Sequence, residues 1–107
     1  MKKPKSPTVS NDLKSANGTS LCGYVKTTYA ELLEKLGEPL RDFSGDGKVT
    51  CEWVIDFHDG TVSTIYDWKL SVTPTHLYNW HIGGRGVNVV ERTGKFLDMI
   101  TSKNFWE

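Results

Sequence analysis

The dipeptide Asp59-Gly60 lies between two runs rich in β-forming residues, and it constrains the fold more than any other feature of this 107-residue chain. An Asp-Gly pair in this setting is typical of a two-residue type I′ hairpin turn. Such a turn predicts Phe57 opposite Val62 and Trp53 opposite Tyr66, and directly paired residues share a face. The expected core face comprises Cys51, Trp53, Ile55, Phe57, Val62, Thr64, Tyr66 and Trp68.

The opposite face of this hairpin is predicted to be polar and to carry the acidic residues Glu52, Asp56 and Asp67. The same register places Glu52 directly opposite Asp67, and like charges in that position destabilise a sheet. We therefore expect a cation nearby, with Lys48, Lys69 and Arg85 as candidates. Two interpretations stay open. The charges form a small ion-pair cluster, or they are functional. In the functional case Glu52, Asp56 and Asp67 form a surface that binds a cationic group of a partner, or Glu52 and Asp67 are a carboxylate pair for acid–base chemistry.

Two helices and two further strands complete the predicted fold. Thr28 and Glu31 have capping-box spacing, and Gly37 followed by Pro39 indicates a stop, so we expect a helix over 28–36. Short strands are predicted at 21–25 and 77–82, and an apolar stripe over 89–100 predicts a second helix after a capping arrangement at 88–91. The chain is thus expected to be α+β, in the order β-α-β-β-β-α. An antiparallel sheet of three to four strands would carry both helices on one face.

The basic charge of this chain is concentrated before residue 20. Residues 1–19 carry four lysines against one aspartate and few apolar side chains, whereas residues 20–107 carry nine basic and twelve acidic residues. A segment with so little apolar surface cannot offset its ordering entropy. We therefore expect a flexible basic tail over 1–19 and a single α+β domain over 20–107.

Composition and spacing argue against several classes of function. Basic and acidic residues balance at 13 each, which disfavours non-specific nucleic-acid binding. No apolar run is long enough for a membrane span, and no apolar region follows the N-terminal lysines, so we expect a cytoplasmic protein. Residues 42–47 resemble the start of a calcium loop, but Trp53 stands where a bidentate Glu is required. The cysteines and histidines are scattered, so no metal, no cofactor and no catalytic residues are predicted.

A glycine-rich segment between the expected third strand and second helix is a candidate anion site. Gly83, Gly84 and Gly86 would form a loop whose backbone amides approach a phosphate, with Arg85 and His81 as further donors. The alternative is a plain connection in which glycine permits a positive φ. A complete dinucleotide or P-loop motif is absent from the sequence.

An ordered set of short motifs resembles a family of small proteins encoded by phages and prophages. These motifs span roughly residues 23–90 and are TTYAEL (27–32), GEP (37–39), EW (52–53), DGTV (59–62), IYDWK (65–69) and WHIGG (80–84). The resemblance implies a mobile-element accessory protein in the cytoplasm of an infected or lysogenic bacterium, and it implies no catalytic residue.

Two functions follow from these features as expectations. The first is a non-enzymatic inhibitor that binds a host defence component, such as a CRISPR effector, through Glu52, Asp56 and Asp67 and through aromatic anchors. The second is a small anionic-ligand binding protein that holds a nucleotide at the Gly83–Gly86 loop with Arg85 and His81.

Overall fold

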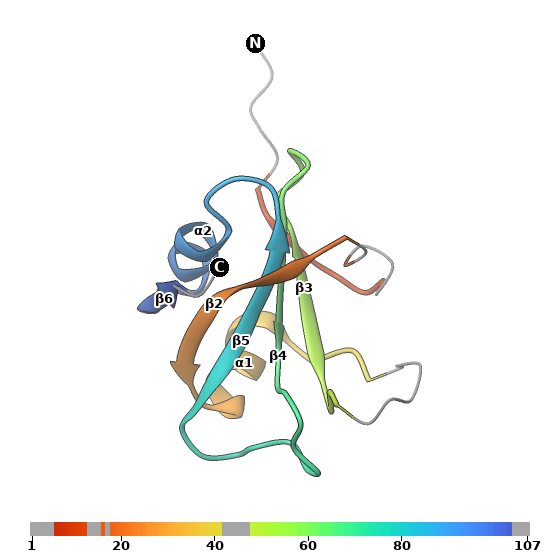
Figure 1. Cartoon of the computed structure of the whole chain (residues 1–107), viewed down its shortest axis with the longest axis vertical. Helices are drawn as coiled ribbons and strands as arrows, with labels where there is room; N and C mark the ends of the chain where they lie inside the picture. Colours follow the sequence, from red (N-terminus) through yellow and green to blue (C-terminus); the bar gives the residue numbers. More distant parts are fainter. Residues whose placement is uncertain (1–5, 13–15, 17, 42–47, 104–107) are drawn as a thin grey trace.

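The computed structural model describes residues 6–12, 16, 18–41 and 48–103, and in these residues it shows an α+β fold (Figure 1). All strand pairs are antiparallel, and the sheet order is β1-β3-β4-β5-β2-β6. The elements are β1 (Thr8–Ser10), β2 (Ser20–Thr27), α1 (Tyr29–Leu36), β3 (Glu52–Asp56), β4 (Val62–Tyr66), β5 (Tyr78–Arg85), α2 (Val89–Leu97) and β6 (Thr101–Lys103). The α+β class is confirmed, and the described sheet has six strands where three or four were expected.

The additional strands are the two short edge strands. Thr8–Ser10, expected in a flexible tail, pairs with β3 as β1, and Thr101–Lys103 pairs with β2 as β6. Low apolar content predicts a flexible segment over 1–19, but an edge strand needs no apolar side chains, because backbone hydrogen bonds hold it to the sheet. Thr8 Oγ1 also lies 2.8 Å from His58 Nε2. The sheet therefore begins before the expected domain boundary at residue 20.

Helix α1 begins and ends as its sequence predicts. The Glu31 amide donates to Thr28 Oγ1 at 3.2 Å, and Gly37 has φ +82° with its amide donating to the Leu33 carbonyl. The second half of the capping box differs, because the Glu31 carboxylate accepts from Thr27 Oγ1 at 2.6 Å. Local signals are sufficient to set both ends of this helix.

The predicted register of the β3–β4 hairpin is wrong by one residue. Trp53 pairs with Ile65 and Glu52 with Tyr66, because the loop contains three residues rather than two. The Asp59 carboxylate accepts from the Thr61 amide at 3.0 Å and pairs with Arg92 at 2.9 Å. Positive φ angles occur at His58 and Gly60, not at Asp59 itself. A one-residue slip moves every side chain of a strand to the other face.

The side chains of β3 point to the predicted faces of the sheet, whereas those of β4 point to the opposite faces from the predicted ones. Trp53 remains in the core, but its partner there is Ile65, which is fully buried, instead of Tyr66. Trp53 packs edge-on against Trp80 with ring centroids 5.6 Å apart, and its indole N–H donates to the Gly37 carbonyl at 2.8 Å. Both helices contribute to this core on one face of the sheet, through Leu32, Leu36, Val89, Val90 and Leu97.

The glycines expected in a loop belong to the central strand β5. Gly83 and Gly84 pair with β2 on one side and with β4 on the other. A Cβ on Gly84 would lie 2.3 Å from Val89 Cγ1, so this glycine permits α2 to pack directly on the sheet. Only Gly86, with φ +106°, has the positive φ expected of a connection.

Helix α2 starts without the capping interaction that the sequence predicts. Asn88 is left-handed at φ 55° and its side chain makes no capping hydrogen bond. Inside the helix, Thr93 Oγ1 donates to the Val89 carbonyl and lies 2.6 Å from Ser63 Oγ of β4. Neither helix in the described part of the chain has the length and apolar character needed to cross a membrane.

Candidate binding site

The face of the sheet opposite the helices, here called the second face, carries the candidate site. Residues of β2, β3, β4 and β5 point to it because they occupy paired positions in the register: Tyr24 opposite His81, His81 opposite Tyr66, and Tyr66 opposite Glu52. The start of β2 passes across this face (Figure 1). The second face is therefore partly covered, and a depression remains beside the covering segment.

This depression, the Glu52 cleft, has a volume of about 170 Å³. Its lining residues come from the chain entering β2, from the strands of the β3–β4 hairpin and the chain on either side of them, and from β5: Thr19, Ser20, Val49, Glu52, Thr64, Tyr66, Trp68 and Gly83. The absence of a side chain at Gly83 keeps the cleft open, because a Cβ there would lie 2.6 Å from Thr64 Oγ1. The register of three strands therefore shapes the cleft.

Glu52 supplies the charge inside the cleft. Its backbone is fixed by two hydrogen bonds with Leu40, at 2.8 and 3.0 Å. Its carboxylate makes no hydrogen bond or ion pair within the described residues, and the same is true of the Thr64 and Tyr66 hydroxyls. Burial raises the pKa of Glu52 from 4.5 to about 7. The cleft thus holds a carboxylate that no hydrogen bond in the described structure stabilises.

Tyr66 lines the cleft beside Glu52, and His81 lies next to Tyr66 on the second face. Their rings are stacked with centroids 5.4 Å apart, and Tyr24 meets His81 edge-on at 5.1 Å. Burial, with the nearby Glu52 charge as a smaller cause, raises the pKa of Tyr66 to about 12. Burial lowers the pKa of His81, whose Nδ1 atom is buried without a partner in the part of the chain described. A neutral His81 is consistent with its aromatic surroundings.

Trp68 forms the outer wall of the cleft and is 39% exposed. The ammonium groups of Lys48 and Lys69 lie 5.7 and 6.0 Å from its ring centroid, within the range of cation–π contacts. The hydroxyl of Tyr78 accepts a hydrogen bond from the Trp68 backbone amide at 3.2 Å. A large aromatic surface with two cations therefore stands at the rim of a cleft that contains one carboxylate.

The three acidic residues predicted to bind a partner lie in three different places. Glu52 is in the cleft, whereas Asp56 lies near the hairpin loop, where its carboxylate accepts from the His58 amide at 2.8 Å. Asp67 is fully buried and accepts from the amides of Thr50 and Cys51 at 2.7 and 3.3 Å. The predicted pair of Glu52 and Asp67 on a polar face is wrong, because the three-residue loop turns Asp67 to the core side.

The residues predicted to bind an anion are also separated. His81 and Gly83 lie on the second face, Gly84 packs under Val89, and Arg85 is exposed at the end of β5. The expected loop with several approachable amides is a strand, in which these backbone groups face neighbouring strands on both sides. The predicted anion-binding loop is therefore wrong at Gly83, Gly84 and Arg85, which belong to strand β5.

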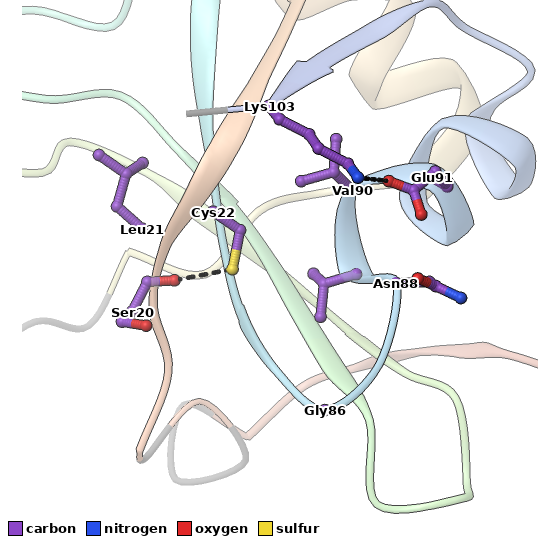
Figure 2. A pocket seen from close by; sticks show the side chains of 9 residues that line it. Ser20, Leu21, Cys22, Gly86, Asn88, Val90, Glu91 and Lys103 are labelled. Carbon is purple, nitrogen blue, oxygen red and sulfur yellow. Dashed lines mark hydrogen bonds and ion pairs between the residues drawn. The ribbon is translucent and has the colours of Figure 1, made fainter. Parts of the chain in front are cut away.

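Gly86 lines a different pocket of about 290 Å³ at the start of α2 (Figure 2). Its two charged side chains are paired with each other, since Lys103 Nζ lies 3.1 Å from Glu91 Oε1. The Cys22 thiol points into it and donates to the Ser20 carbonyl at 3.2 Å (Figure 2). The charged groups of this pocket are thus paired with each other, whereas Glu52 in the cleft has no ion pair within the described residues.

Metal-ligating side chains do not gather in the described residues: no three His, Cys, Asp or Glu lie close enough together to hold an ion. The calcium-like segment 42–47 lies outside the described residues. Cys22 and Cys51 are both free, and burial, reinforced by the Asp67 charge, raises the pKa of the Cys51 thiol to about 11.

Sequence reasoning missed the residues that make the cleft. Tyr66 and Trp68 were expected in the core, and Thr64 with them. A three-residue loop at 58–60 assigns all three to the second face, and the signal for it is that Ile65 is a better core residue than Tyr66. Lys48 and Lys69 were expected only as partners for acidic residues, and instead lie over Trp68.

No family model matches this chain, and the searches of curated proteins and of solved structures also found no match.

Proposed function

We propose that this chain is a non-enzymatic binding protein of a phage or prophage, and that it captures a host protein with the second face of its sheet. The observation that carries the proposal is Trp68, a half-exposed indole beside Tyr66 at the mouth of the Glu52 cleft. Trp and Tyr are enriched among the residues that dominate binding energy at protein interfaces. The motif resemblance to phage proteins is the reason for expecting the partner to be a protein of the bacterial host, and specifically a defence component.

Binding is favoured over catalysis by the arrangement of the polar groups in the cleft. Covalent catalysis needs a nucleophile hydrogen-bonded to a base. In the residues that the structure describes, the Thr64 and Tyr66 hydroxyls are bonded neither to Glu52 nor to His81. A carboxylate, two hydroxyls and an aromatic wall suffice to recognise a partner.

The interface that we propose differs from the one expected from the sequence. Asp67 stabilises the core side of the sheet and Asp56 holds the hairpin loop, so Glu52 is the only one of the three acidic residues assigned to the interface. Anion capture at 83–86 is not proposed, because the backbone groups on which it depended pair within the sheet.

Affinity capture with matched variants tests the proposal. The tagged wild-type chain, Trp68→Ala and Ile100→Ala are expressed in a bacterial host, and captured proteins are quantified by mass spectrometry. Ile100 is 92% exposed and lies beside α2, which packs on the other face of the sheet, so Ile100→Ala removes an exposed apolar side chain elsewhere. We expect Trp68→Ala to lose the specific partner and Ile100→Ala to retain it.

The magnitude can be checked once the partner is purified. An interface anchor costs about 2 kcal/mol or more on truncation, which corresponds to roughly a thirtyfold weaker dissociation constant. Equal capture by the wild type and Trp68→Ala, with both folded, would contradict the assignment of the second face.

A further inference from the structure

The Glu52 cleft has a polarity that restricts its occupant. Its lining includes Glu52, whose ionised carboxylate only accepts hydrogen bonds, and Thr64 and Tyr66, which carry hydroxyls. Outside, at the rim, are the ammonium groups of Lys48 and Lys69 over Trp68. A complementary ligand presents N–H donors to the interior, a flat surface to the indole, and negative charge to the rim.

The volume of the cleft limits the part of a ligand that enters it. Pockets for drug-sized ligands have volumes of about 300–1,000 Å³, and this cleft has about 170 Å³. A single planar group fits this space better than a whole nucleotide or peptide. Planar groups with adjacent N–H donors that match a carboxylate include the guanidinium of arginine and the Watson–Crick edge of guanine.

The rim lysines distinguish between these two groups. An arginine side chain would bring a third positive charge next to the ammonium groups of Lys48 and Lys69, and like charges repel. A guanine nucleotide would place its neutral base inside and its phosphate outside, where both ammonium groups attract it. The distribution of charge therefore favours the nucleotide.

We propose that the Glu52 cleft binds the base of a guanine nucleotide, with the Glu52 carboxylate accepting from the N1–H and N2–H groups, Trp68 stacking on the base, and Lys48 and Lys69 contacting the phosphate. This proposal goes beyond the capture of a host protein and does not depend on it, although both place Glu52 and Trp68 at the binding surface. Base–aromatic stacking is tolerant of sequence, so the carboxylate is the element that selects guanine. Adenine presents a lone pair at N1, which a carboxylate repels.

The protonation state of Glu52 gives the site a characteristic pH dependence. Only the ionised carboxylate accepts both N–H bonds, and burial raises the pKa of Glu52 to about 7. The other titratable groups that face it are Tyr24, Tyr66 and His81, with Lys48 and Lys69 at the rim. Burial raises the pKa of Tyr66 and lowers that of His81, so neither gains a charge near neutral pH. Guanine binding should therefore weaken about tenfold per pH unit below about pH 7.

Nuclear magnetic resonance titration of the ¹⁵N-labelled full chain tests the site. Guanosine 5′-monophosphate at pH 8 should shift the Trp68 indole and Glu52 amide resonances, with at least about tenfold tighter binding than adenosine 5′-monophosphate. Glu52→Gln should remove this preference, and Trp68→Ala should weaken both nucleotides. Glu34→Gln changes an exposed carboxylate of α1 and should bind as the wild type does.

The outcomes separate the possible ligands. N-acetyl-arginine amide shifting the same resonances in place of the guanine nucleotide would overturn the proposal in favour of a basic side chain. Equal binding of both nucleotides, or unchanged guanine preference in Glu52→Gln, would also overturn it. A single-stranded dT hexamer with one central dG identifies the source. If the hexamer binds more tightly than guanosine 5′-monophosphate, the natural ligand is a nucleic acid. If it binds more weakly, the natural ligand is a free nucleotide. Both results support the guanine site.

Discussion

Replacing Glu52 by Gln should stabilise the protein at alkaline pH and should have much less effect at acid pH. Burial raises the pKa of this carboxyl from 4.5 to about 7 in the folded chain, and the unfolded chain keeps the lower value. Between these two values the folded state binds a proton that the unfolded state has lost. The free energy of unfolding of the wild type therefore falls as pH rises through this range, and the cost is complete above about pH 7.

The magnitude follows from the size of the shift. Each pKa unit corresponds to about 1.4 kcal/mol, so the full shift amounts to roughly 3 kcal/mol. Glu52 is only partly buried, and solvent screening reduces the expected effect to about 2 kcal/mol. The Gln side chain has nearly the same shape and no titration, so this pH-dependent cost is absent in Glu52→Gln.

Urea unfolding of the wild type and Glu52→Gln from pH 4 to 8.5 measures the effect. The difference in unfolding free energy should be smallest near pH 4 and should rise by about 2 kcal/mol by pH 8. The lowered pKa of His81 changes stability in the opposite direction, because the unfolded state gains a proton first as pH falls. That contribution is present in both proteins and cancels in the difference.

Glu34→Gln is the matched control, since Glu34 is exposed on α1. Its difference from the wild type should vary little with pH. A flat difference for Glu52→Gln as well, or a variant less stable than the wild type at pH 8, would refute the argument that the Glu52 carboxylate is buried without compensation.

Three further substitutions test the packing. Trp53→Ala should lower the free energy of unfolding by about 3–5 kcal/mol in urea titrations, as large aromatic truncations in cores do; a loss below about 1 kcal/mol would contradict its burial. Gly84→Ala should cost about 1–3 kcal/mol through overpacking against Val89, and an unchanged melting temperature would show that α2 does not pack so closely. Asp67→Ala should cost about 3 kcal/mol, because the Thr50 amide and hydroxyl lose their acceptor; a thermal shift of less than a degree would show that the network is dispensable.

The sequence was most informative where the structural signal is local. Thr28, Gly37 and the apolar stripe between them predict α1, because capping and helical periodicity depend on residues a few positions apart. The hairpin was predicted in position but not in register. Its three-residue loop depends on the Asp59 side chain, which bonds the Thr61 amide, and an Asp-Gly pair does not reveal that contact.

The candidate site depends on long-range contacts that the pattern of one strand does not contain. Alternation of apolar and polar residues predicted one buried and one solvent-exposed face of the hairpin. Val54 and Thr64 are nevertheless buried on the second face, because the start of β2 partly covers it. With apolar residues on both faces, alternation no longer fixes the register. Gly83 was similarly ambiguous, because its role is to admit a neighbouring side chain from another strand.

The short strand β1 protects the sheet from self-association. It lies along β3, a strand whose Val54 and Ile55 are fully buried and whose outer backbone groups would otherwise be open to pairing. Three residue pairs hold it, together with the contact between Thr8 and His58. An unprotected apolar edge of this kind is a template for other chains. Removing these three residues would therefore open the β3 edge to pairing with a second chain.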